Sequence, residues 1–272
     1  MDLLGFIIIC VKVLVVFAAT MLTVLMMIYA ERRVSAFIQG RLGPNRVGPQ
    51  GILQPIADGI KFLMKEDIIP ASVDKPIFIL APAVLLIPAL MTFAVIPFGS
   101  DITLFGRQIP LQVADVNVGI LYVLALTSIG VYGIVLAGWS SNSKYSLLGG
   151  LRSAAQLISY ELAMGLAVVS IILLSGSLKL NDIVADQQGY LFSWNVFKQP
   201  VAFIIFLIAV YAETNRLPFD LSEAEQELVG GYHTEYSSIK FSMFFMAEYA
   251  NMITAAALTV TLFFGGWDVP LI

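Results

Sequence analysis

The chain has 272 residues, of which 58% are hydrophobic and 12% are charged, and its mean hydropathy is +0.87. Several apolar runs reach the length of about 20 residues that a bilayer crossing needs, so the sequence predicts an all-α polytopic membrane protein and excludes a soluble domain. The formal net charge is -4, with one cysteine and one histidine. These counts exclude disulfide frameworks, tetrahedral zinc sites, cysteine-ligated iron-sulfur clusters and bis-histidine haem within this chain. We therefore expect no metal or redox centre here, and any electrons must be carried by another chain.

Hydropathy predicts six membrane-spanning helices within a single membrane domain, residues 1–272. The first begins at residue 3, but its apolar run is longer than that of a cleavable signal peptide and lacks a basic start, so we interpret it as a permanent helix. Lys12 in this helix either snorkels along its stem or faces a protein interior. The predicted spans are residues 3–30, 77–96, 119–139, 154–175, 191–212 and 241–264.

Lysine and arginine are distributed unevenly between the loops. The loops after the first, third and fifth spans hold eleven of them, whereas the opposite loops hold only Arg107, Lys179 and Lys198. Because basic residues are retained on the inner side, the N-terminus is predicted to be outside. The two long loops, residues 31–75 and 213–238, are then predicted to share the inner face.

The first inner loop, residues 31–75, contains a predicted interfacial helix. Its segment "GRLGPNRVGPQG" holds six glycines and prolines, which indicates irregular backbone. The following "ILQPIADGIKFLMKED" places isoleucine, leucine and methionine on one helical face and polar residues on the other, as in a helix that lies in the membrane plane. Two interpretations stay open: a membrane-surface anchor, or the floor of a gate that admits a lipid-like molecule.

The second inner loop, residues 213–238, is strongly acidic. A capping pattern predicts a short helix with Ser222 as its N-cap, Glu225 completing the capping box and Gly230 as the stop. Arg216 is expected to suit the last turn of the preceding span, and His233 is expected to be a polar loop residue. The acids form either a solvated face or a functional group; they are Glu213, Asp220, Glu223, Glu225, Glu227 and Glu235.

Two further acids, Glu161 and Glu248, lie inside predicted spans. Each is about eight residues from the inner end of its span, so both are expected about 12 Å below the acidic loop. Carboxyl groups in the hydrocarbon region usually face a bundle interior and mark proton or ion paths. The alternative is a neutral structural glutamic acid, with Asn251 as a partner for Glu248. Glu31 and Glu213, at the inner ends of their spans, are predicted to connect the surface to the interior.

Three segments carry a resemblance to a known family. "AERRVSAFIQGRLGPNRVGPQGILQPIADGIKFLMKED", "LRSAAQLISYELAMG" and "AETNRLPFDLSEAEQELVGGYHTEYSSIKFSMFFMAEYANM" closely resemble the quinone-module membrane subunit of proton-pumping NADH:quinone oxidoreductase, respiratory complex I. The resemblance implies a bacterial or organellar inner-membrane subunit that forms much of the chamber for the quinone substrate. It implies partner subunits that carry FMN and iron-sulfur clusters, small membrane subunits, antiporter-like subunits and lipid, and no nucleic acid.

The resemblance also implies roles for particular residues. Arg32, Arg41, Asp58 and Lys61 fall in the motifs that line or gate the quinone chamber. The proton path implied by the family comprises Glu161, Glu213, Glu223, Glu227 and Glu248, together with Glu31, Asp220, Glu225 and Glu235.

The chain departs from the family in its number of spans. The family usually has eight, and six are predicted before the sequence reaches "GGWDVPLI". Either two helices are missing from this sequence or it is an unusually short member. Other functions also stay open at this point: the equivalent subunit of a membrane-bound hydrogenase or photosynthetic complex, a stand-alone proton or cation transporter, or a plain membrane anchor.

Overall fold

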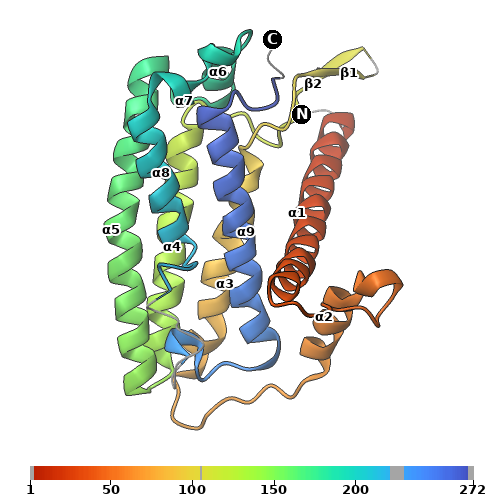
Figure 1. Ribbon diagram of the computed structural model, residues 1–272, viewed down its shortest axis with the longest axis vertical. Coiled ribbons are helices and arrows are strands. Elements are labelled where there is room, and N and C mark those ends of the chain that lie inside the picture. The colour runs from red at the N-terminus through yellow and green to blue at the C-terminus, as the bar shows by residue number, and fades with distance from the viewer. Residues whose placement is uncertain (1–2, 105, 221–229, 269–272) are drawn as a thin grey trace.

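The protein is a bundle of long apolar helices (Figure 1). The computed structural model describes residues 3–104, 106–220 and 230–268. Within these residues, five helices are long and apolar enough to cross a membrane, and a sixth apolar helix, α8, is shorter. This confirms the predicted all-α polytopic fold. The six are α1 (Leu3–Ile38), α3 (Lys75–Met91, extended by the 3-10 turn η2, Thr92–Ala94), α4 (Gly119–Ser140), α5 (Lys144–Ser175), α8 (Pro200–Glu213) and α9 (Ser238–Phe263).

Successive long helices alternate in direction, so α1 begins and α9 ends at the same end of the bundle (Figure 1). We call this the N-terminal end, and the opposite one, where the loops rich in lysine and arginine lie, the basic end. Short elements connect the long helices at both ends. They are η1 (Pro49–Gly51) and α2 (Gln54–Met64), the antiparallel strands β1 (Ile102–Leu104) and β2 (Arg107–Ile109) with Thr103 opposite Gln108, α6 (Leu180–Ala185), η3 (Leu191–Ser193), α7 (Asn195–Lys198) and η4 (Gly231–His233).

Two predicted helix boundaries were wrong because polar sequence continues the helix beyond the apolar run. Helix α1 extends to Ile38 and stops before Gly40, which adopts a left-handed φ of 65°. Glu31 and Arg32 therefore belong to α1 rather than to a loop. Helix α5 begins at Lys144, ten residues before the predicted start. Its first turns are rich in glycine and serine, and these small residues are buried against α4 and η4, which compensates for their low helix propensity.

The predicted fifth span is broken into three pieces, η3, α7 and α8. Helix α8 starts at Pro200, a residue suited to the first helical turn, and ends at Glu213. The chain cannot continue as a helix there because Asn215 adopts a left-handed φ of 49°. With 14 residues, α8 is about 21 Å long, less than the roughly 30 Å of a bilayer's hydrocarbon core. Its end at Glu213 therefore lies inside the bundle.

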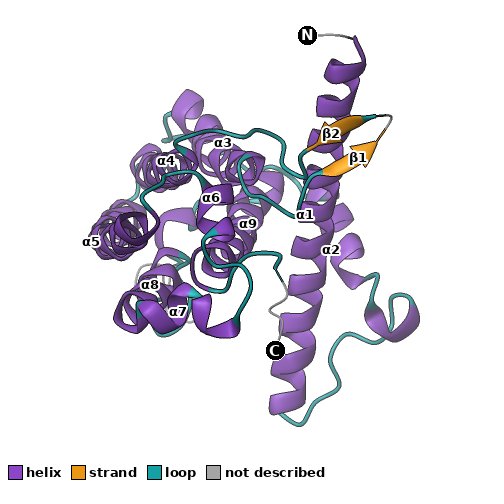
Figure 2. Ribbon diagram, turned by 90° about the horizontal axis from the view of Figure 1, so that it is seen from above, coloured by secondary structure: helices purple, strands orange, loops and turns teal. Residues whose placement is uncertain are grey.

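The predicted interfacial helix is present as α2, beside the basic end of α1 (Figures 1 and 2). Its apolar side chains Ile56, Ile60 and Leu63 are exposed on the molecule, whereas the Asp58 carboxyl group is mostly covered. Such an arrangement suits a helix that turns its apolar face to lipid and its polar face to the protein.

The bundle has two apolar clusters with a polar layer between them. One is centred on Phe206 and Phe263 and the other on Phe78 and Phe244. Along α5, Leu157 belongs to the second cluster, Met164 to the first, and Glu161 lies between them. Helix α1 stands apart from this bundle, next to α9 (Figure 2).

Close packing of α5 against η4 at the basic end depends on Gly149. A Cβ atom at this position would lie 2.7 Å from the Cα atom of Gly231, a distance that forces the backbone to shift. We expect Gly149→Ala to destabilise the protein by about 1–3 kcal/mol, the usual cost of overpacking. The matched control is Gly165→Ala on the same helix, where an added Cβ meets no atom within 4 Å. Thermal unfolding in detergent should show a lower Tm for the first variant only; equal Tm values would contradict this packing.

Candidate functional site

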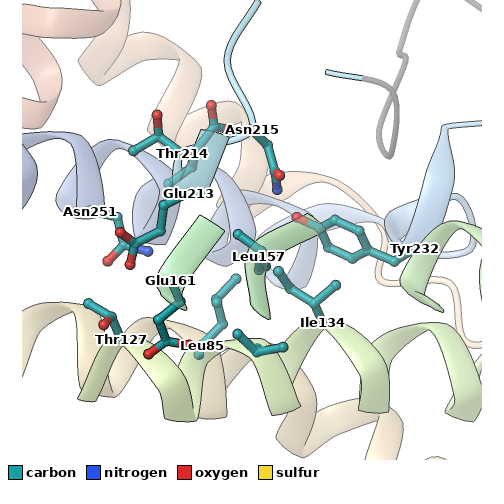
Figure 3. A pocket seen from close by; sticks show the side chains of 13 residues that line it. Leu85, Thr127, Ile134, Leu157, Glu161, Glu213, Thr214, Asn215, Tyr232 and Asn251 are labelled. Atoms are coloured by element: carbon teal, nitrogen blue, oxygen red, sulfur yellow. The ribbon is translucent and has the colours of Figure 1, made fainter. Parts of the chain in front are cut away.

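Three glutamates line a small cavity inside the bundle, and Figure 3 labels two of them, Glu161 and Glu213. Its volume is about 40 Å³, enough for water, which needs about 10–15 Å³. Glu161 comes from α5, Glu213 from the end of α8 and Glu248 from α9, and all three line the cavity. We call it the carboxylate cavity.

Glu161 and Glu248 were predicted to lie at a common depth, and both line the same cavity. The start of α5, from which the depth of Glu161 was counted, was wrong. Because α5 starts earlier than expected, Glu161 lies 17 residues after the start of α5, not eight, and 14 before its end at Ser175. Glu248 lies 15 residues before the end of α9 at Phe263. Counted from the N-terminal end, both are about 21–23 Å along their helices, so the two carboxyl groups lie at a similar level in the bundle. Glu213 reaches the same level because α8 is short, so the expectation that it lies at the membrane surface was wrong.

Hydroxyl and amide groups surround these acids. The Ser128 hydroxyl donates a hydrogen bond to Glu161, and the Thr127 hydroxyl is within hydrogen-bonding reach of Glu213. Asn251 also lines the cavity, and its buried Oδ1 atom accepts no hydrogen bond within residues 3–104, 106–220 and 230–268. Such an acceptor suits a water molecule or a protonated carboxyl group as its donor.

The stretch after α8 is held at this depth by Gln156 of α5. Its amide group donates to the backbone oxygens of Ala212, at 3.0 Å, and of Phe219, at 2.8 Å. Irregular backbone at membrane depth is tolerated where the protein satisfies its polar groups in this way. The same stretch carries Arg216 into the space between α1 and α9.

Arg216 binds two glutamates from different helices. Its Nη1 atom lies 3.1 Å from Glu31 Oε1 on α1, and its Nε atom lies 2.8 Å from Glu248 Oε1 on α9. A guanidinium keeps its proton in proteins, and here two carboxylates stabilise the positive charge as well. Arg216 thus stays charged, and the expectation that it merely completes a helix end was wrong. Only its position in the acidic stretch could have suggested this role from sequence.

Tyr249 of α9 completes this cluster. Its hydroxyl donates to Glu31 Oε2 at 2.6 Å, and its ring lies under the Arg216 guanidinium, 4.9 Å from ring centroid to Cζ. Tyr249 therefore holds Glu31 through a hydrogen bond and Arg216 through a cation–π contact. We call Glu31, Arg216, Glu248 and Tyr249 the arginine bridge.

A larger cavity of about 510 Å³ lies between α1, α2 and α9. Glu31 and Tyr249 of the arginine bridge line it, together with Arg32, Asp58 and apolar side chains. Arg32 of α1 forms an ion pair with Asp58 of α2, and Gln54 donates to the same carboxylate. We call it the α2 cavity.

The other predicted site residues lie away from these two cavities. Arg41 is exposed and donates to Gln39, and Lys61 is exposed on α2 with its ammonium 5.9 Å from the Phe62 ring centroid. Asp220 and Glu235 are half-buried and are not among the residues that line either cavity. The predicted helix from Ser222 lies outside the described residues, as do Glu223, Glu225 and Glu227.

His233 differs from its prediction as a polar loop residue. It is buried in η4 between aromatic rings, with Tyr232 at 5.0 Å and Phe241 at 5.3 Å between ring centroids. Nearby Tyr236 is also buried, which raises the pKa of its hydroxyl to about 12, although a hydrogen bond with Ser140 opposes the shift. Both residues therefore pack the basic end rather than line the carboxylate cavity.

Fold and site together define a polytopic helical membrane protein with a row of partly buried carboxyl groups inside its bundle and a larger cavity between α1, α2 and α9. Comparison with protein families matches residues 11–272 to the NADH dehydrogenase family, and the chain belongs to that family.

The chain is 61% identical over 270 residues to an NADH-quinone oxidoreductase subunit of Geobacter metallireducens, covering 95% of this chain and 78% of the relative. It is 60% identical to an NADH-quinone oxidoreductase subunit of Geobacter sulfurreducens, covering 95% and 77%. It is 58% identical to NADH-quinone oxidoreductase subunit 8 of Rhodothermus marinus, covering 93% and 72%. The family resemblance of the three sequence motifs is thereby confirmed, and the chain is a subunit of an oxidoreductase complex.

Proposed function

We propose that this subunit binds the head group of a quinone in the α2 cavity and couples its reduction to proton translocation through the arginine bridge and the carboxylate cavity. The membrane is a bacterial or organellar inner membrane. The electrons come from an iron-sulfur cluster on a partner subunit, which receives them from FMN on another. The names of the relatives favour NADH as the donor over the hydrogenase alternative.

The α2 cavity has the properties expected of a quinone site. Its volume of about 510 Å³ falls in the range of small-molecule pockets, and its lining is mostly apolar with a few charged groups. It lies between α2, whose apolar face suits the membrane surface, and the apolar helices α1 and α9. A lipid-soluble quinone can therefore enter from the bilayer and place its carbonyl oxygens near Arg32 and Tyr249.

The observation that carries the coupling proposal is the double ion pair of Arg216. Glu31 lines the α2 cavity and Glu248 lines the carboxylate cavity, and one guanidinium binds both. Any change of charge on one glutamate alters how strongly Arg216 binds the other, since Coulomb interactions are strong in a low-dielectric interior.

The chemistry of quinone reduction supplies such a change. Conversion of a quinone to a quinol takes up two electrons and two protons. The electrons must come from the partner subunit, and protons can be drawn from groups that border the α2 cavity, such as the Tyr249 hydroxyl, which donates to Glu31. Loss of this proton places a negative charge beside Arg216, which strengthens the interactions of the guanidinium at the α2 cavity and weakens its pairing with Glu248. Glu248 then gains affinity for a proton, and Glu213 and Glu161 follow along the cavity.

Narrowing the α2 cavity tests the quinone site separately from the coupling. Gly59 of α2 borders it, and an added Cβ there meets no atom within 4 Å, so a leucine should be accommodated at the expense of cavity space. We expect Gly59→Leu to raise the KM for a short-chain quinone about tenfold, which corresponds to about 1.4 kcal/mol of binding.

Ala57→Leu, also on α2 but outside the cavity lining, is the control and should leave the KM unchanged. NADH:quinone reductase activity of the assembled complex measures both. An unchanged KM in an assembled Gly59→Leu complex would place the quinone elsewhere.

A further inference from the structure

A separate apolar groove runs between α1 and the rest of the bundle toward the N-terminal end. Two adjoining cavities, of about 320 and 290 Å³, lie side by side, with Val16, Thr20, Phe93 and Val113 in the linings of both. Its walls are α1 on one side and the end of α3 with the following loop on the other. We call it the α1 groove; the α2 cavity is lined by other α1 residues, from Met21 to Arg32, nearer the basic end.

The groove matches one acyl chain in length and chemistry. Its lining on α1 extends from Val11 to Thr23, about 18 Å along the helix at 1.5 Å per residue. One leaflet of a bilayer contributes about 15 Å of hydrocarbon. Most of the side chains in the lining are aliphatic or aromatic, and the hydroxyl groups of Thr20 and Thr23 donate to backbone oxygens of α1 itself. An acyl chain therefore gains apolar contact there without leaving these hydroxyl groups unsatisfied.

Lys12 supplies a positive charge on the groove lining. Its ammonium donates to the backbone oxygen of Gln112 at 3.1 Å, which leaves further N–H donors on the same group. Within residues 3–104, 106–220 and 230–268 it forms no ion pair; the charge of Asp101 acts on it only from a greater distance. Gln112 in turn donates to the oxygen of Val95, one residue beyond the end of η2. The ammonium therefore lies level with the end of the apolar helix α3.

We propose that the α1 groove binds one anionic phospholipid, with an acyl chain between α1 and α3 and its phosphate on Lys12. An apolar groove beside a cation is complementary to such a lipid at both ends. A zwitterionic lipid would fill the α1 groove without a net negative charge to pair with the Lys12 ammonium. A helix of a partner subunit would cover the groove and leave this ammonium without an anion. The bound lipid fixes the spacing of α1 from the bundle, and α1 also carries Glu31.

Photo-crosslinking of the whole assembled complex tests this site. The probe is phosphatidylglycerol with a diazirine on its acyl chain, incorporated into proteoliposomes, and labelled peptides are mapped by mass spectrometry. We expect labelling on residues 11–23 and 93–113 of the wild-type subunit. Lys12→Met should reduce it about fivefold, the factor corresponding to about 1 kcal/mol for one lysine near an anionic lipid, whereas Lys12→Arg should retain it.

Two neighbouring alanines on α1 provide the matched pair for the groove itself. Ala19 lines it and Ala18 does not. Ala19→Phe should block the groove and lower the labelling, and Ala18→Phe should not. The proposal is overturned if Lys12→Met labels as strongly as wild type, if a phosphatidylcholine probe labels equally well, or if the wild-type groove is not labelled because a partner helix fills it. Because none of these readouts depends on quinone reduction, their failure is distinct from failure of the proposed function.

Discussion

Replacing Arg216 by glutamine should largely uncouple the α2 cavity from the carboxylate cavity. The substitution leaves Glu248 without its cation in a bundle interior, where that side chain is only 18% exposed. Removing one partner of a fully buried ion pair costs about 3–5 kcal/mol, and the 26% exposure of Arg216 places the expected cost at about 2–3 kcal/mol. We expect NADH-driven proton pumping to fall at least about tenfold, since each 1.4 kcal/mol in a barrier is a factor of ten.

Arg216→Lys is the matched control for charge. Lysine keeps the positive charge, but a single ammonium cannot reproduce the fork that binds Glu31 and Glu248 together. We therefore expect intermediate pumping in an assembled complex, measured with a pH-sensitive dye in vesicles. Full pumping by Arg216→Gln would show that the two cavities communicate without this side chain.

Replacing Glu213 by glutamine should have the second largest effect. Glu213 lines the carboxylate cavity at the end of α8, and its carboxyl group is within reach of the Thr127 hydroxyl and the charge of Glu161. Glutamine preserves the shape and the hydrogen bonding but cannot release a proton, so the relay stops at this position. We expect the pumping rate of the assembled complex to fall about tenfold or more, consistent with the 10²–10⁴-fold contribution of positioned proton-transfer groups.

Glu235→Gln is the control, because Glu235 belongs to the same acidic stretch but lies outside the lining of both cavities. It should pump at the wild-type rate. Equal rates in Glu213→Gln and wild type, or an equal loss in Glu235→Gln, would contradict a path that runs through the cavity rather than over the acidic surface.

The fold class could be predicted from sequence because it depends on composition. Long apolar runs must be helical in a membrane. Helix α2 could be predicted because its apolar residues recur with the 3.6-residue period of an amphipathic helix. Boundaries were less predictable. Hydropathy detects where apolar residues stop, whereas α1 and α5 continue through Arg32 and Gly149 because packing and local propensity still favour a helix.

The acidic residues of the site could be predicted from sequence, but their arrangement in space could not. Glu161 and Glu248 stand out because a carboxyl group in an apolar run is costly. The depth of Glu213 depends on the short length of α8, which in turn depends on the left-handed Asn215 and on Gln156 from another helix. Arg216 meets Glu31 across 185 residues of sequence. Tertiary contacts of this kind leave no local pattern, so the arginine bridge had to be seen in the structure.

The most direct measurement is the proton yield of a complex that carries Glu161→Gln and Glu248→Gln together. Both residues line the carboxylate cavity from opposite helices, and the glutamines leave its shape unchanged. Protons translocated per NADH oxidised are to be measured in proteoliposomes of verified subunit composition. We predict a yield well below that of the wild-type complex, with assembly intact. A wild-type proton yield from the assembled double variant would contradict it.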